Sequence, residues 1–155
     1  MTVSLKKSAA EVDRHQSLLD VRTKTSALIA SLSDLADADS SAFQCYMEAC
    51  ALPHITEGEK NLRRTAKEAS LVRATQVPLD AAAEMGRGVE IAEVAARLVE
   101  THVRSEVLAG EVLLRASIKS VLLSVDANLS GISDTTIRDS LKMKRRELEL
   151  ASTGL

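Results

Sequence analysis

The stretch from Val103 to Ile132 limits the fold of this chain more than any other, because it is a long, largely apolar run without proline. Its length is too great for a single β-strand and predicts one helix. When the stretch is placed on a helix, with about 100° per residue, its polar residues fall on two separate stripes. The first is charged and predicts a solvent-facing surface: Arg104, Glu111, Arg115, Lys119 and Asp126. The second is small or polar: Glu106, Gly110, Leu113, Ser117, Ser120, Ser124, Asn128 and Gly131. Apolar residues fill both flanks, so we expect this helix to be the central, buried element of the fold.

The stripe of small and polar residues has two interpretations. It can allow close packing of helices, with serine hydroxyls donating to the carbonyl one turn back. Alternatively it is the wall of a pocket, where Ser117, Ser124 and Asn128 orient a ligand on an apolar surface. Glu106 and Asn128 lie about 33 Å apart along the helix. One small ligand can therefore contact both only if a second subunit brings the other end of the helix across.

The sequence before residue 53 also predicts helix, without a β-period. We expect a first helix over 8–36, then a break at 37–41, where Asp39 is a suitable N-cap. A short helix over 40–52 would follow, and Pro53 would end it. We expect this short helix to bury Phe43 and Met47.

The later part of the chain carries clear helix signals. Thr56 and Glu59 form a capping box that starts a helix. Pro78 falls inside its periodic pattern and is expected to bend the helix and free a carbonyl about four residues back. Asp134, after Ser133, would cap a last, charged helix on the surface or on a partner. The whole of 1–155 is therefore predicted to be one all-α domain, an up-and-down bundle of about five helices.

Composition excludes several classes of function. The net charge of −2 gives no electrostatic reason to expect nucleic acid or an anionic membrane as partner. No apolar run approaches a membrane span, and Met1–Ala10 lacks the apolar core of a secretory signal. Cys45 and Cys50 point to different sides of one helix and suit neither a disulfide nor a metal clip. We expect a cytoplasmic protein.

The candidate chemistry is acid–base chemistry. The three histidines are scattered, and no metal-ligand spacing, P-loop or nucleophile motif occurs, so we expect no metal. His54 follows Pro53 and is either a proton carrier or an exposed loop histidine. Glu106 begins the central helix and is either an acid or base in catalysis or a first-turn capping acid.

Five segments occur in a familiar order: D-x-x-A-F (39–43), L-P-H-I-T-E-G-E-K (52–60), A-T-Q-V-P-L (74–79), S-E (105–106) and L-S-V-D-A-N-L (123–129). Together they resemble the formiminotetrahydrofolate cyclodeaminase and methenyltetrahydrofolate cyclohydrolase family over 6–134. The resemblance implies an all-helical homodimer that opens or closes a C–N bond at a folate one-carbon unit without a metal or other required cofactor. The substrate would be a tetrahydrofolate derivative. The implied catalytic residues are Glu106, where the family has aspartate, and His54, where it has lysine. The residues implied to bind or orient substrate are Asp39, Ser105, Ser124 and Asn128, and Ser117 of the small and polar stripe is a further candidate.

The sequence also departs from the family pattern. It starts after the family's usual P-T-P-G-G-G-S segment and small-residue helix, and Ser124 replaces the first asparagine of L-N-V-x-x-N. We therefore expect weak turnover of folate and recruitment to another cyclisation, imine or amidine reaction. The alternative is a non-catalytic helical dimerisation or scaffold protein derived from the family.

Overall fold

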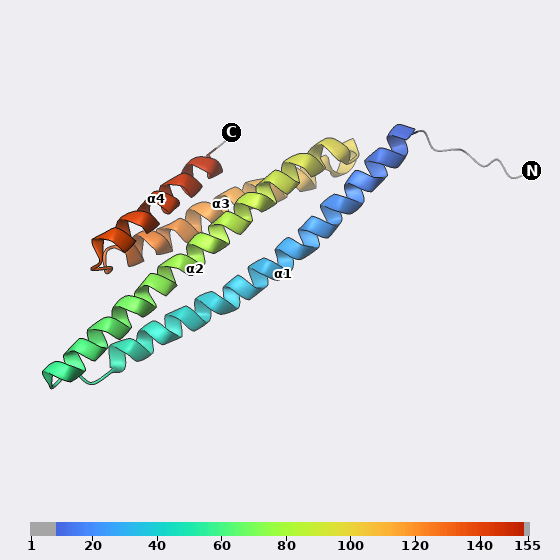
Figure 1. Cartoon of the computed structure of the whole chain (residues 1–155). Helices are drawn as coiled ribbons and strands as arrows, with labels where there is room; N and C mark the ends of the chain where they lie inside the picture. The colour runs from blue at the N-terminus through green and yellow to red at the C-terminus, as the bar shows by residue number, and fades with distance from the viewer. Residues whose placement is uncertain (1–8, 154–155) are drawn as a thin grey trace, which may run out of the picture.

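The computed structural model describes residues 9–153 and confirms the all-α, up-and-down arrangement (Figure 1). It has four α-helices and one 3₁₀ turn: α1 (Ala9–Ala51), α2 (Glu57–Leu98), η1 (Thr101–Val103), α3 (Arg104–Leu129) and α4 (Thr135–Ser152). Two of the helices are long enough to give an elongated molecule, about 65 Å along α1. Among the described residues, no helix is long and apolar enough to cross a membrane.

The helix count differs from the prediction because α1 runs through the expected break. No proline or glycine occurs within Ala9–Ala51. The hydroxyls of Ser40 and Ser41 donate to the carbonyls of Ala36 and Asp37 one turn back, at 3.2 and 2.9 Å, so these residues continue the helix. Asp39 is therefore a mid-helix residue, and its prediction as an N-cap is wrong. The expected start at Ser8 lies outside the described residues.

The connection from α1 to α2 follows its local signals. α1 ends before Pro53, and the capping box is confirmed: Thr56 Oγ1 accepts from the Glu59 backbone N–H at 3.2 Å. The Glu59 carboxylate accepts in return from the N–H of Thr56 at 2.8 Å. Arg63 then donates through Nε and Nη2 to the carbonyl of Cys50, at 3.1 and 2.9 Å, which ties the end of α1 to α2. The short loop is thus held from both sides.

α2 continues through Pro78, and α3 supplies the missing hydrogen bond. The proline has no N–H, so the carbonyl of Ala74 loses its partner within the helix. The side-chain amide of Asn128 donates to this carbonyl at 3.0 Å. The carbonyl expected to be freed four residues before the proline is therefore satisfied, and the bond fixes α3 against α2 at this level.

α2 is the helix on which the others pack. Among the described elements, α1 packs on α2 alone, whereas α3 and α4 pack on α2 and on each other. The core lies mostly between α2 and α3 and consists of Leu71, Leu79, Ala82, Val89, Ile118, Leu122, Val125, Leu129, Ile132 and Leu141. α1 and α3 both pack on α2 but their backbones do not pack on each other, so a groove runs over α2 between them.

α3 is not enclosed within one chain, which corrects the expected burial of both its flanks. It buries one face and exposes the other, where Leu113 and Leu123 are 67% and 68% accessible to solvent. Ser117, Ser120 and Ser124 are exposed as well. The central helix of the sequence prediction therefore faces solvent along the stripe that was expected to lie inside.

The charged stripe of α3 is covered in part by other helices. Arg115 is buried, and it bonds Glu111 and Glu93 at 2.9 Å each and the Ser152 carbonyl at 3.3 Å. Asp126 pairs with Arg145 of α4 at 2.8 Å. The prediction of a solvated stripe holds for Arg104, Lys119 and Asp126, which are exposed, and is wrong for Arg115, over which the end of α4 packs. The Asp134 cap of α4 is confirmed, since its carboxylate accepts from the N–H groups of Thr136 and Ile137.

Candidate functional site

The groove over α2 contains two hollows. The first, called here the Pro78 hollow, holds about 250 Å³ and is lined by Leu32, Leu35, Ala36, Asp39, Val77, Pro78, Ala81, Met85, Val121 and Ser124. The second, called the Lys67 hollow, holds about 480 Å³ and is lined by Tyr46, His54, Lys60, Arg63, Arg64, Lys67, Glu68, Leu71, Gly131 and Ser133. Both are bounded by α1, by α2 and by α3 or the loop after it.

The two hollows are successive sections of one groove. Each wall advances by seven residues between them: Asp39 to Tyr46 on α1, Pro78 to Leu71 on α2, and Ser124 to Gly131 on α3 and its loop. Seven residues are two helical turns, or about 10.5 Å. Since α1 and α3 run opposite to α2, all three shifts point in the same direction (Figure 1).

The opposite end of the groove narrows at Gly88. An added Cβ there would lie 2.9 Å from Leu28 Cδ2 of α1 and 3.1 Å from Leu114 Cδ1 of α3. The two leucines therefore converge over a glycine whose missing side chain makes room for them. The usable length of the groove runs from the Pro78 hollow to the Lys67 hollow.

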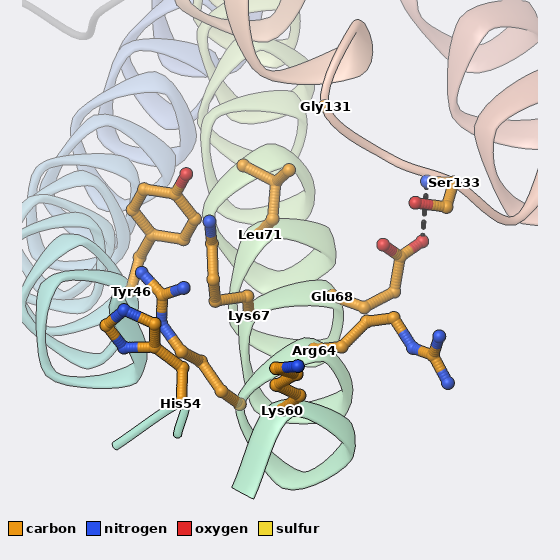
Figure 2. A pocket seen from close by; sticks show the side chains of 10 residues that line it. Tyr46, His54, Lys60, Arg64, Lys67, Glu68, Leu71, Gly131 and Ser133 are labelled. Atoms are coloured by element: carbon orange, nitrogen blue, oxygen red, sulfur yellow. Dashed lines mark hydrogen bonds between the residues drawn. The ribbon is translucent and has the colours of Figure 1, made fainter. Parts of the chain in front are cut away.

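The Lys67 hollow is strongly basic. His54 reaches it from the loop that the capping box holds, and Figure 2 shows Tyr46, His54 and Lys67 together on the α1 side. Lys60 pairs with Glu57 at 2.6 Å, and Arg63 is bound to Cys50. Lys67 has no side-chain hydrogen bond or ion pair with any described residue, so its ammonium is available to an anion.

Tyr46 adds a neutral phenol to this hollow. Its pKa is raised above the ordinary 10.0, first by a side-chain hydrogen bond with Cys50 and then by burial. The phenol therefore stays protonated at physiological pH. It stands beside His54, the only imidazole among the described residues that line the groove.

The Pro78 hollow has a different character. Its walls are apolar except for the Asp39 carboxylate on α1 and the Ser124 hydroxyl on α3. Asn128 lies between the levels of the two hollows, four residues after Ser124, with its amide held by the Ala74 carbonyl. Its amide nitrogen is thereby committed to the fold, which leaves Oδ1 as the group that can accept from a ligand.

Comparison with known proteins identifies the family. The family model described as formiminotransferase-cyclodeaminase matches residues 1–147. The chain belongs to the formiminotransferase-cyclodeaminase family. It is 31% identical over 121 residues to formimidoyltransferase-cyclodeaminase of Gallus gallus, covering 77% of this chain and 22% of that protein. It is 29% identical over 149 residues to methenyltetrahydrofolate cyclohydrolase of Methylorubrum extorquens, covering 96% of this chain and 70% of that protein. The chain thus spans about a fifth of the chicken protein's length.

Some of the predicted site residues lie at the groove, and others lie far from it. Asp39, Ser124, Asn128 and His54 line it or border it. Ser105 and Glu106 lie at the far end of α3, exposed, with a long contact of 3.5 Å between hydroxyl and carboxylate. About 60 Å, the length of α2, separates that end from His54. Ser117 lies on exposed α3 surface between the two ends.

The sequence prediction missed two residues of this cyclodeaminase-family groove, Tyr46 and Lys67. A signal for both was present, because Tyr46 follows Asp39 by seven residues and Lys67 follows Lys60 by seven, and each pair shares a helix face. No group of three or more His, Cys, Asp or Glu within the described part of the chain is placed to hold a metal ion.

Glu68 closes the Lys67 hollow on the side of Ser133, and this contact predicts a pH dependence. Its carboxylate accepts from the backbone N–H of Ser133 at 2.7 Å, as Figure 2 shows, and from that of Asp134 at 2.9 Å. The bond from Asp134 is the main cause that lowers the pKa of Glu68 below its ordinary 4.5. A lowered folded-state pKa adds stability above the ordinary value, and this contribution is lost as the pH falls through the folded-state pKa.

We therefore expect Glu68→Gln to be less stable than wild type at neutral pH, with a difference that shrinks below the ordinary pKa of 4.5. Urea unfolding midpoints from neutral pH to about 3 measure this. Glu147→Gln on the exposed surface of α4 is the matched control and should follow wild type. A constant difference between Glu68→Gln and wild type over the whole range would contradict the assignment.

Proposed function

We propose that this chain makes or breaks a C–N bond at a one-carbon unit, of the cyclodeaminase or cyclohydrolase type, by acid–base catalysis. One observation carries the proposal. Four of the five motif segments, distant in the sequence, converge on the same groove through Asp39, His54, Pro78 and Asn128. The names of the two relatives point to folate one-carbon chemistry, and we propose a tetrahydrofolate derivative or a similar amidine as substrate.

The reaction class needs two proton transfers. In hydrolysis of a cyclic amidinium, water adds to the carbon of the C=N bond and gives a proton to a base. The C–N bond then breaks, and the leaving nitrogen receives a proton. In ring closure with deamination, a ring nitrogen adds to the same carbon and ammonia leaves. His54 can serve in either step, because an imidazole can both accept and donate a proton.

The second group in the proposal is Glu106, and it requires a second copy of the chain. Within one chain Glu106 is too far from His54 to contact the same ligand. The exposed apolar face of α3 supports an interface there, and Phe43 and Met47 of α1 add to it with 63% and 52% exposure. The chain exposes 10518 Å² in total. A compact monomer of this mass is expected to expose about 7600 Å².

The stripe on α3 gives the register of the proposed dimer. A two-fold interface pairs each residue with its counterpart about the axis. If two α3 helices cross antiparallel with the axis at Ser117, Gly110 meets the level of Ser124, and Glu106 meets the level of Asn128. The small side chains at Gly110, Ser117 and Ser120 permit close approach. Glu106 of the second copy would then enter the groove between the two hollows. It would face α2 from the open side of the groove.

The test combines turnover with oligomeric state. Purified chain is assayed with methenyltetrahydrofolate for hydrolysis and with formiminotetrahydrofolate for ring closure, and its mass is measured by light scattering. Leu113→Glu places a charge in the proposed interface and should yield a monomer with little turnover. Met143→Glu, on exposed α4, is the control and should remain an active dimer. A folded dimer that turns over neither substrate would reject the enzyme and favour the scaffold alternative.

A further inference from the structure

Pro78 lies in the interior of α2, where a proline normally weakens a helix. It removes one backbone hydrogen bond and crowds the preceding turn. Pro78 is buried, and the helix continues on both sides of it. The bond that it removes is the one to the Ala74 carbonyl, and Asn128 of α3 donates to this carbonyl instead, at 3.0 Å. The proline therefore makes a backbone acceptor of α2 available to a side chain of another helix.

This acceptor determines which way round the Asn128 amide lies. A primary amide has a donor end, Nδ2, and an acceptor end, Oδ1. Because Nδ2 is bonded to the Ala74 carbonyl, a flipped amide would bring two acceptor oxygens together and lose the hydrogen bond. No described residue donates to Oδ1, so the acceptor end is left for a group that is not part of the fold.

Asn128 lies at the level between the two hollows of the groove. It follows Ser124 of the Pro78 hollow by four residues and precedes Gly131 of the Lys67 hollow by three. Spacings of three and four keep these positions on one side of α3 and its loop. Asn128 is half-buried, so part of its side chain is accessible from the groove.

We propose that Pro78 is a positioning residue, which leaves the Ala74 carbonyl without a helical partner and thereby holds the Asn128 amide with its acceptor end free for the groove. The inference rests on the proposed function. A fixed acceptor there can bind an N–H group of the amidine or a proton of the attacking water. A flipped amide would present its own N–H groups to the same donors. The amide does not titrate, so Asn128 orients the reactants and leaves the proton transfers to the acid–base groups.

Pro78→Ala restores the missing N–H and tests this role. The new N–H donates to the Ala74 carbonyl within α2, so Asn128 no longer has that acceptor to itself. The melting temperature should equal that of wild type or rise, because alanine is the better helix former. With both substrates of the turnover assay, kcat should nevertheless fall about tenfold, the worth of one neutral hydrogen bond, and KM should change less. A variant that is at least as stable but slower is not expected from a merely structural role.

Gly86→Ala is the matched control on the same helix. It also replaces a poor helix former by alanine, and an added Cβ at Gly86 meets no atom within 4 Å. The position is twelve residues from Ala74, about 18 Å along α2. This variant should be more stable than wild type and turn over at the same rate, which separates the loss of positioning from a general stiffening of α2.

The side-chain amide signals of Asn128 report the positioning without any substrate. In ¹⁵N-labelled protein, this pair of signals is assigned by its absence from Asn128→Ala. In wild type and Gly86→Ala the bonded proton should exchange slowly with solvent, and in Pro78→Ala the exchange should be faster. A wild-type pair that exchanges as fast as the amides of exposed side chains overturns the inference, whatever the fold of Pro78→Ala.

The double variant Pro78→Ala, Asn128→Ala should be no slower than Asn128→Ala alone, because both changes act through one amide. Additive losses of kcat would overturn the positioning role. So would wild-type turnover in a Pro78→Ala chain whose Asn128 amide is released, while the proposed function would stand. If wild type itself turns over neither substrate, the proposed function fails, and the amide signals alone decide whether Pro78 holds Asn128.

Discussion

Glu106→Gln is expected to lower turnover by about 10²–10⁴, the usual contribution of a positioned general acid or base. The amide has nearly the same shape and still accepts a hydrogen bond, but it cannot exchange a proton. Glu106 is exposed at the start of α3, so the substitution should leave the fold intact. Turnover and melting temperature, measured on the same preparation, separate this role from a structural one.

A capping role predicts a different result. An acidic residue in the first turn of a helix is worth up to about 1 kcal/mol through its interaction with the helix N-terminus. In that case Glu106→Gln lowers the melting temperature slightly and leaves the rate unchanged. Unchanged turnover would remove Glu106 from the mechanism and leave His54 as the candidate acid or base.

Complementation tests whether the site is shared between two subunits. Glu106→Gln and His54→Gln chains, each of low activity alone, are unfolded together and refolded as a mixture. A dimer with one chain of each kind has one groove with both intact groups, so the mixture should regain about a quarter of wild-type activity. If both groups acted within one chain, mixing would restore nothing.

Local sequence signals predicted the parts of the fold that depend on neighbouring residues. The capping box at Thr56 and Glu59 and the Asp134 cap need no distant partner, and both are confirmed. The carbonyl freed by Pro78 was predicted for the same reason, since it follows from the missing N–H of proline. Its partner Asn128 was not predicted, because that contact depends on how α3 packs on α2.

Burial was predicted less well because it depends on which helices meet. The charges at 37–41 suggested a break, but serine hydroxyls and the absence of proline and glycine let α1 continue. Phe43 and Met47 were expected inside and are exposed, because none of the described helices packs on that face of α1. The stripe on α3 was expected to be enclosed because its flanks are apolar. Apolar flanks indicate a partner surface, but they do not say whether the partner belongs to the same chain.

The residues of the candidate site were also predicted in part, whereas their arrangement depends on packing. Asp39, His54, Ser124 and Asn128 were found through motif segments, and the fold brings them to one groove. Glu106 was found in the same way but lies outside the groove of its own chain. The sequence showed that Glu106 and Asn128 of one chain cannot contact the same small ligand, because the helix rise places them about 33 Å apart. It could not show which face of α3 is exposed and available to the proposed dimer.

Arg115→Met is expected to destabilise the fold by about 3 kcal/mol, the lower end of the range for breaking a buried ion pair. The guanidinium side chain is 8% exposed and joins three elements, through Glu111 of α3, Glu93 of α2 and the carbonyl of Ser152 at the end of α4. Removing it leaves the Glu111 carboxylate buried without a cation, and this uncompensated charge is the main cost. Glu93 is nearly half exposed and recovers hydration, which keeps the effect at the lower end.

Urea unfolding at one protein concentration measures this loss, with Lys24→Met as the matched control. Lys24 pairs with Asp20 in an exposed i,i+4 contact, so its replacement should cost less than about 0.5 kcal/mol. The double variant Arg115→Met, Glu111→Leu should recover part of the loss, because the buried carboxylate is removed together with its partner. A double variant as unstable as the sum of the two single variants would show that Arg115 and Glu111 are not coupled. In that case, the contribution of Arg115 to the junction of α2, α3 and α4 would come from Glu93, from the Ser152 carbonyl and from packing.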